Sequence, residues 1–303
     1  MTNGAGVSSE GDFHCHSNRS DGTRSPADLV AMAAAHGVRV FALTDHDTLD
    51  GLDEARAAVA AHPGMAFVPG VEFGCYEPGT EVHILGLFVD PTDDAFRTEI
   101  AEAHRMRIER GEAITAALAS LGVPVSWERV REIAGEASVG RPHFARALIE
   151  AGHVADVDEA FARYLGRNSP AYIEGKRLYP QEAIELIHGA GGLAVFAHPP
   201  FTADYERIAE GLAGMGLDGI EVYYRHYEPE VVESLRALAE RLDLVPSGGS
   251  DFHGLEREHE HEPGHFDMPR EAVARLLEVA RERGCANVPD IDLTSAPGTE
   301  ARA

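Results

Sequence analysis

Val38-Arg-Val-Phe-Ala-Leu-Thr-Asp-His-Asp47 is the stretch of sequence that decides the fold. Its first part, residues 38–43, is short, apolar and rich in β-branched and aromatic side chains, which is typical of a buried β-strand. The strand ends in polar residues, and Asp45 and His46 are of types that ligate metals. Functional side chains of α/β barrels collect at the carboxyl ends of strands, so this segment favours such a barrel.

Similar apolar runs recur along the chain, with helical stretches between them. We expect strands over residues 11–16, 38–44, 66–72, 82–89, 193–198, 219–224 and 244–250. The helix after Thr23 is well marked, because Ser25 can cap it, Pro26 suits its first position and Gly37 can end it. Alternating strands and helices predict a parallel α/β architecture, and about seven strands are close to a barrel.

Between residues 94 and 179 the strand signals vanish and helical periodicity replaces them. Ile114, Leu118 and Leu121 repeat at helical spacing, and similar patterns follow. We therefore expect an all-helical insertion over residues 94–179. The barrel would then be discontinuous in sequence, with residues 1–93 and 180–303 forming one domain.

Composition limits the classes of function. The 26 basic and 51 acidic residues give a formal charge of −25, which argues against stable DNA binding, although short RNA is not excluded. No window approaches 18 apolar residues, and Met1 to Glu10 lack the features of a signal peptide, so we expect a cytoplasmic protein without a membrane partner. Three scattered cysteines argue against a disulfide scaffold.

Imidazole and carboxylate side chains recur at the predicted strand ends. They are His14, His16, Asp21, His46, Glu72, His83, His198, Asp251 and His253. Any one of these could be incidental, and His83 or His198 alone would more often be a core histidine. Together they would be costly to bury unpaired, so we expect a metal cluster. This ligand mixture suits Mn, Fe or Zn, and such a cluster indicates hydrolysis by metal-activated water.

Two cationic segments could contact an anionic substrate. Arg141-Pro-His143 precedes Phe144 at a predicted helix start, where backbone N–H groups favour a phosphate. Lys176-Arg177 is a second pair, for which a solvated loop is the alternative. His259 and His261 lie in a charged tract near the site and could be either metal ligands or solvated loop residues.

With these residues assembled, the chain resembles the PHP (polymerase and histidinol phosphatase) superfamily of metal-dependent phosphoesterases. The resemblance rests on four motifs, which are Asp12-Phe-His-Cys-His16-Ser with Ser20-Asp21-Gly22, Leu43-Thr-Asp-His-Asp47, Ala197-His-Pro199 and Gly249-Ser-Asp-Phe-His253. Gly140-Arg-Pro-His-Phe-Ala-Arg146 and Phe161-x-x-Tyr-Leu165 resemble the helical insertion of small bacterial PHP nucleotide phosphoesterases. That group contains 3′,5′-nucleoside bisphosphate and AMP phosphatases and a 5′-to-3′ exoribonuclease.

The resemblance implies a distorted (β/α)7 barrel that holds three divalent ions, for which Mn is our expectation and Fe or Zn the alternatives. The implied ligand sets are His14, His16, Glu72 and Asp251 for one ion, Glu72, His83 and His198 for another, and Asp21, His46 and His253 for the last. A hydroxide bridging two metals would attack phosphorus. Asp45 would orient the site, and Arg141 and His143 would bind the substrate and neutralise its phosphate oxygens during catalysis. Lys176 and Arg177 are further candidates for substrate contact that do not rest on the resemblance.

The function that this resemblance implies is hydrolysis of a phosphomonoester of a small nucleotide, with a 3′,5′-nucleoside bisphosphate or AMP as the expected substrate. The alternatives are a sugar, histidinol or cyclic ribose phosphate, or 5′-to-3′ trimming of short RNA oligonucleotides. A structural PHP module that has lost its ligands is disfavoured, because all nine positions carry the expected residue types.

Overall fold

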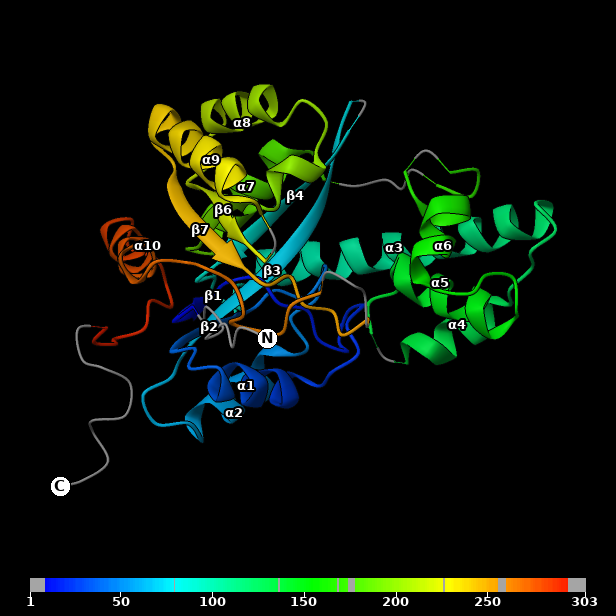
Figure 1. Ribbon diagram of the computed structural model, residues 1–303, viewed down its shortest axis with the longest axis horizontal. Coiled ribbons are helices and arrows are strands. Elements are labelled where there is room, and N and C mark those ends of the chain that lie inside the picture. Colours follow the sequence, from blue (N-terminus) through cyan, green and yellow to red (C-terminus); the bar gives the residue numbers. More distant parts are fainter. Residues whose placement is uncertain are drawn as a thin grey trace, which may run out of the picture.

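A single seven-stranded sheet, nearly closed into a barrel, forms the body of the protein (Figure 1). The computed structural model describes residues 9–78, 80–135, 137–167, 169–173, 178–225, 227–255 and 260–293. The strands follow sequence order around the sheet and are β1 (Gly11–Asp12), β2 (Val40–Leu43), β3 (Ala66–Glu77), β4 (Thr80–Leu87), β5 (Leu193–Phe196), β6 (Gly219–Tyr224) and β7 (Val245–Gly249). Each overlaps a strand predicted from sequence, and the predicted barrel class is confirmed.

The expectation of an all-parallel sheet is wrong for β4. Strand β4 is antiparallel to both β3 and β5, whereas the other neighbouring pairs are parallel. The connection between β3 and β4 consists of residues 78–79, and a connection so short allows only an antiparallel partner, because a parallel one needs a crossover of a dozen residues or more.

Helices cover the outside of the barrel (Figure 1). They are α1 (Pro26–Ala35), α2 (Leu52–Ala60), α7 (Pro180–Gly189), α8 (Tyr205–Gly214), α9 (Pro229–Leu242) and α10 (Arg270–Glu282), and a short 3-10 turn, η2 (Pro199–Phe201), follows β5. Helix α1 begins as predicted, because the Ser25 hydroxyl accepts a hydrogen bond from the Asp28 amide at 3.1 Å and Pro26 occupies the first turn. Within the described ranges, no helix is both long and apolar enough to cross a membrane.

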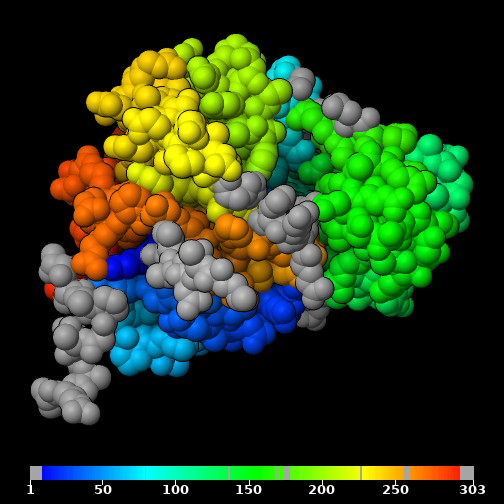
Figure 2. Space-filling model, in the orientation of Figure 1, coloured from blue at the N-terminus to red at the C-terminus, as the bar shows by residue number. Residues whose placement is uncertain are grey.

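A helical lobe extends from one side of the barrel, as Figure 2 shows. It comprises α3 (Asp94–Ser120), α4 (Trp127–Ala134), α5 (Arg141–Glu150), α6 (Val157–Ala160) and the π-helical segment η1 (Phe161–Leu165). Helix α3 joins the two parts, because Phe96 and Ile100 belong to the barrel core whereas Ile114 and Leu118 belong to a separate apolar cluster of the lobe. The predicted boundary at residue 94 thus lies at the first residue of α3. The residues of α3 pack in the barrel core up to Ile100 and in the apolar cluster of the lobe from Ile114.

The last and first strands come together through glycine. The Phe13 amide donates to the Gly248 carbonyl at 3.1 Å, and the Asp251 amide donates to the His14 carbonyl at 2.8 Å. A Cβ atom at Gly249 would lie 2.2 Å from the Cβ of His14, closer than packed atoms allow. Glycine therefore lets β7 approach the segment that follows β1, and this approach places His14 beside Asp251.

We predict that Gly249→Ala lowers the free energy of unfolding by roughly 1–3 kcal/mol, because an added methyl group must push His14 away from β7. Urea unfolding of both proteins measures this difference. Gly214→Ala is the matched control, since a Cβ there meets no atom within 4 Å and a helical alanine is at least as stable as glycine. Equal stability of the Gly249→Ala variant and the native protein would contradict the closure argument.

Candidate metal centre

Imidazole and carboxylate side chains from most strands of the barrel converge at one end of it. Among the described residues, four groups have ligand atoms within 4.8 Å of one another; one is His36, Glu262 and His265, and the other three consist of predicted ligands. They are His16, Asp21, His46 and His253, then His14, His16, Glu72 and Asp251, and finally His46, Glu72 and His83. The structure thus brings together eight of the nine predicted ligands in these groups, and the ninth, His198, contacts Glu72 at 3.2 Å.

The group of His14, His16, Glu72 and Asp251 lies on the Oε2 side of the Glu72 carboxylate. The Nε2 atoms of His14 and His16 are 3.0 Å apart, and both face Glu72 Oε2, at 3.1 and 3.0 Å. Asp251 Oδ1 lies 3.3 Å from His14 Nε2 and 3.1 Å from His16 Nε2. Two imidazole nitrogens and two carboxylate oxygens therefore face one point, as the ligands of one cation do.

The other oxygen of Glu72 faces the opposite way. Glu72 Oε1 lies 2.7 Å from His83 Nδ1 and 3.2 Å from His198 Nε2. The carboxylate of Glu72 is buried, with 1% of the residue exposed. Glu72 is thus placed to bridge two neighbouring sites, one through each oxygen, which is the geometry that the expected ligand sets require.

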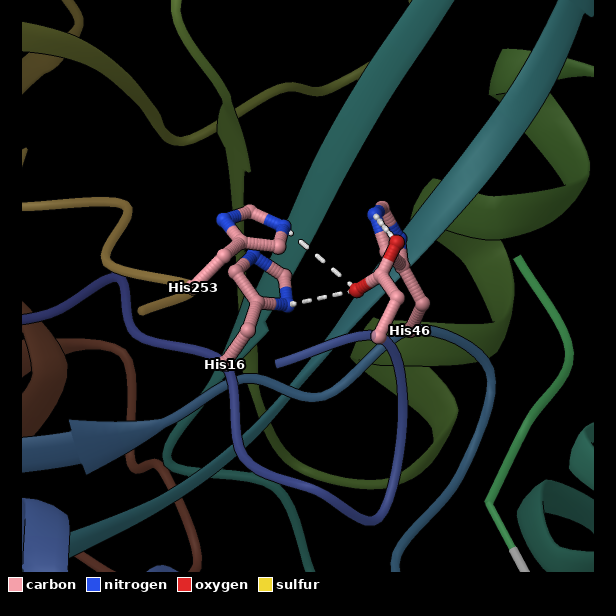
Figure 3. A group of neighbouring side chains, drawn as sticks. His16, His46 and His253 are labelled. Atoms are coloured by element: carbon pink, nitrogen blue, oxygen red, sulfur yellow. Dashed lines mark ion pairs between the residues drawn. The ribbon is translucent and has the colours of Figure 1, made fainter. Parts of the chain in front are cut away.

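The group of His16, His46 and His253 surrounds Asp21, which lies in the loop after β1. Figure 3 shows His16, His46 and His253 converging on one carboxylate. The shortest separations from Asp21 are 3.4 Å to His253 Nε2, 3.9 Å to His46 Nε2 and 4.0 Å to His16 Nδ1. Burial alone would raise the pKa of Asp21, but the imidazoles of His46 and His253 outweigh it and hold that pKa well below its usual range.

Metal ions fit this donor set. Four polar atoms in it, His16 Nδ1, Asp21 Oδ1, His46 Nδ1 and His198 Nδ1, are buried and make no hydrogen bond within the described residues. Leaving such atoms unpaired costs about 1–3 kcal/mol each, a cost that ligation of a cation would remove from those that face one. Mixed imidazole and carboxylate ligands suit Mn, Fe and Zn, and the structure itself does not select among them.

Protonation of His16 and His83 reflects the same demand for positive charge, whereas burial holds the pKa of His46 well below its usual range. Burial would lower the pKa values of His16 and His83, but neighbouring carboxylates raise the pKa of His16 to about 10 and that of His83 to about 9. Glu72 is a neighbour of both histidines. Without metal, protons thus serve as the cations between these carboxylates, and bound metal would displace them.

Glu221 is a site residue that the sequence analysis missed. It is fully buried in β6, where its Oε1 accepts a hydrogen bond from His14 Nδ1 at 3.1 Å and its Oε2 accepts one from the His198 amide at 2.6 Å. The first bond fixes His14 Nε2 as the nitrogen that faces the cluster. A charged residue within the apolar run Gly219–Tyr224 was the signal that could have identified it.

Asp45 lies under the loop that carries Asp21. Its carboxylate accepts hydrogen bonds from the Ser17 amide at 2.7 Å, the Ser17 hydroxyl at 2.6 Å and the Ser20 hydroxyl at 2.6 Å. Asp45 therefore fixes the loop that leads to Asp21. This arrangement agrees with the expected orienting role, which stays a prediction.

The pocket beside the cluster is lined by both parts of the protein. It is open to solvent at its mouth, and its walls carry the imidazoles and carboxylates of the cluster together with cationic side chains. Four arginines line it, namely Arg107 and Arg110 from α3, Arg141 from α5, and Arg225 just after β6. Of these, only Arg141 was predicted from sequence, because it lies at a helix start. Arg107 and Arg110 lie within a helix, where arginines usually extend into solvent.

The predicted substrate contacts have different surroundings. Arg141 lies 3.6 Å from Glu81 and packs over the rings of Phe161 and Tyr172. His143 is buried, its Nδ1 accepts the Gly140 N–H at 2.9 Å, and burial lowers its pKa to about 4. It is therefore neutral at neutral pH, so it would bind phosphate through a hydrogen bond and not through charge.

The remaining candidates from sequence are less informative. Lys176, Arg177 and His259 lie outside the described residues. His261 donates from Nδ1 to the His265 carbonyl at 2.9 Å in an exposed segment, and it is not among the described residues that line the pocket.

Comparison with known proteins identifies the family. A PHP domain model matches residues 12–177. A 5′-3′ exoribonuclease of Haemophilus influenzae is 37% identical, over 80% of this chain and 89% of its own length. A 3′,5′-nucleoside bisphosphate phosphatase of Chromobacterium violaceum is 34% identical, over 89% of this chain and 98% of its own length.

Solved structures show the same relationship. A Chromobacterium violaceum protein described as an amidohydrolase, solved with sulfate and no metal, is 33% identical with a TM-score of 0.80 and covers 88% of this chain and 97% of its own. A Bifidobacterium adolescentis protein described as a metal-dependent phosphoesterase is 32% identical with a TM-score of 0.79, over 88% of this chain and 95% of its own. The chain belongs to the PHP domain family of phosphoester hydrolases.

Proposed function

We propose that this protein hydrolyses a phosphomonoester of a small nucleotide, and that its substrate is a nucleoside 3′,5′-bisphosphate. The observation that carries the proposal is a pocket lined both by the imidazole and carboxylate cluster, which would be positive with metals bound, and by arginines. A substrate with two separated phosphates matches two such regions. The bisphosphate phosphatase of Chromobacterium violaceum, which aligns over 98% of its length, supports this choice.

Trimming of short RNA from the 5′ end is the second candidate. The observation in its favour is the 37% identity to an exoribonuclease of Haemophilus influenzae. The formal charge of −25 favours short oligonucleotides over long nucleic acid.

The nine residues would hold three divalent ions, with Mn as the proposed metal. The proposed ligand sets are His14, His16, Glu72 and Asp251, then Glu72, His83 and His198, and finally Asp21, His46 and His253. When bound, these ions would activate water and withdraw charge from the phosphate oxygens. The separate oxygens of Glu72 would hold two ions close together, and Glu221 and Asp45 would keep the ligands oriented.

The arginines would bind the phosphate that does not react. Arginine forms two parallel hydrogen bonds to a phosphate, and Arg141 is already held between two aromatic rings. In the free protein its guanidinium faces Glu81 at 3.6 Å, so a substrate phosphate would take the place of that carboxylate. We also propose that residues 94–179 act as a unit that caps the barrel, because α3 and α5 of this segment supply three of the lining arginines.

Removal of metal provides the first test. We expect exhaustive chelation to abolish phosphate release and added Mn to restore it, because activation of water depends on the ions. The melting temperature should rise with Mn, since bound ions tie several strands together. Full activity in a sample that elemental analysis shows to be free of metal would refute the mechanism.

The position of Glu221 generates a second prediction. Glu221→Gln should weaken metal binding by about 10- to 100-fold, because the hydrogen bond that orients His14 is weakened. Metal content after dialysis against a series of metal buffers measures this loss. Glu233→Gln on α9, whose side chain is 74% exposed, is the control and should bind metal normally. Unchanged metal affinity in the Glu221 variant would show that His14 is oriented without it.

Arg141 tests the choice of substrate. Arg141→Ala should lower kcat/KM for a nucleoside 3′,5′-bisphosphate by about 10²-fold, within the roughly 1.5–3 kcal/mol of a charged hydrogen bond. Hydrolysis of p-nitrophenyl phosphate, which has no second phosphate, should change little.

The control is Arg129→Ala, a half-exposed arginine of the same lobe that pairs with Glu150. It should leave both substrates unaffected. Equal losses on both substrates in the Arg141 variant would place Arg141 at the reacting phosphate instead.

A further inference from the structure

Phe201 presents an aromatic ring to solvent at the edge of the metal centre. It is 59% exposed, the largest value among the exposed large hydrophobic residues of the described ranges. It ends the η2 turn, three residues after His198. His198 has a positive φ of 31°, and this sharp turn brings the chain back so that the rings of Phe201 and His198 lie 5.6 Å apart. A single exposed apolar residue is ordinary, but Phe201 lies among other aromatic rings and beside a residue of the metal centre.

Two tyrosines hold the Phe201 ring in place. Tyr224 and Tyr227 lie 5.6 and 6.4 Å from it, with ring planes inclined by 78° and 66°. These near edge-to-face contacts fix the orientation of Phe201. We call Phe201, Tyr224 and Tyr227 the aromatic cluster.

The aromatic cluster is connected to the metal centre at two points. The rings of Phe201 and Tyr224 both contact His198, and the Tyr224 hydroxyl donates to Asp251 Oδ2 at 2.5 Å. Arg225, which lines the pocket, lies over the Tyr224 ring at 5.1 Å. The aromatic cluster thus lies next to the pocket, in contact with His198 and Arg225, which line it.

We propose that the aromatic cluster is the subsite for the nucleobase of the substrate, with Phe201 as its stacking platform. This proposal rests on the proposed function, which assigns contacts to the two phosphates of the nucleotide and none to its base. The metals would take the reacting phosphate and the arginines of the lobe the other, while the aromatic cluster lies on the barrel side. Stacking accepts any base, because every base has an aromatic face.

A second aromatic residue near the pocket is less suited to this role. Phe161 of η1 lines the pocket, but the Arg141 guanidinium lies over its ring at 5.8 Å, and Tyr172 is approached by Arg110 and Arg141 in the same way. Those rings hold the arginines. Phe201 differs from them in its exposed surface beside a metal ligand.

The test compares substrates with and without a base. In Phe201→Ala, KM for adenosine 3′,5′-bisphosphate should rise by roughly 5- to 100-fold with kcat preserved, as expected for lost stacking of ~1–3 kcal/mol. KM for ribose 3,5-bisphosphate, which lacks the base, should change less than about twofold on the same reasoning. Phe201→Trp should restore tight binding of the adenosine substrate, since tryptophan also stacks.

Three outcomes would overturn the proposal. Equal rises in KM on both substrates would show that Phe201 does not read the base. A fall in kcat together with a loss of bound metal by elemental analysis would show that Phe201 only supports His198. An equal effect of Tyr179→Ala, the removal of a 54%-exposed aromatic residue that packs against Tyr76, would show a nonspecific loss of apolar surface.

Equilibrium binding separates this proposal from the proposed function. Adenosine carries no phosphate and is not consumed, so calorimetric titration into the metal-loaded protein reports on the base subsite alone. We expect adenosine to bind the native protein at least about fivefold more tightly than Phe201→Ala, and ribose to bind both equally. Equal adenosine affinity overturns the platform. Failure of the native protein to hydrolyse any nucleoside bisphosphate, with adenosine binding still dependent on Phe201, refutes the substrate and leaves the platform standing.

Discussion

The rest of the structure depends on one buried carboxylate, that of Glu72. It is 1% exposed, yet imidazoles of His14, His16, His83 and His198 lie within 3.2 Å of its two oxygens. Burial would raise its pKa, but the surrounding histidines outweigh this and hold the pKa well below its usual range. An ionised carboxylate in the core is tolerated only where positive charge surrounds it. The strands must therefore be placed so that their ligands meet at this point, whether protons or metal ions supply the charge.

The reversed direction of β4 follows from the same requirement. Parallel strands bring their carboxyl ends to one rim, so residues after β1, β2, β5 and β7 meet there. His83 lies near the amino end of β4, and it reaches this rim because β4 runs opposite to its neighbours. Glu81, two residues earlier on the same face of the strand, faces His83 Nε2 at 3.1 Å and Arg141 at 3.6 Å. The hairpin of β3 and β4 therefore connects the metal cluster, through Glu81, to Arg141 of the helical lobe.

Much of the fold and the convergence of the imidazoles and carboxylates could be predicted from sequence because both follow from local patterns. Apolar runs show where strands lie, and a polar residue directly after a run lies at the rim, as His46 and Asp251 do. The alternation of strands and helices predicted that β4 is parallel to its neighbours. Only the two-residue connection between β3 and β4 indicated that it is antiparallel. Glu221 was hidden because a single charged residue in an apolar run has no fixed partner in the sequence, and His14 is 207 positions away. Which arginines face inward depends on the packing of α3, which its periodicity alone does not determine.

The charge distribution explains how an acidic protein can select an anionic substrate. The formal charge of −25 repels polyanions over most of the surface. The binding of a long nucleic acid is therefore electrostatically unfavourable. Three arginines of the pocket face carboxylates, as Arg107 faces Asp47, Arg141 faces Glu81 and Arg225 faces Asp251. A small ligand must carry enough negative charge to displace these carboxylates from the arginines. Its phosphates can displace more than one carboxylate only if they are separated in space. This pairing supports the proposed preference for compact molecules with more than one phosphate over both polymers and esters with a single phosphate.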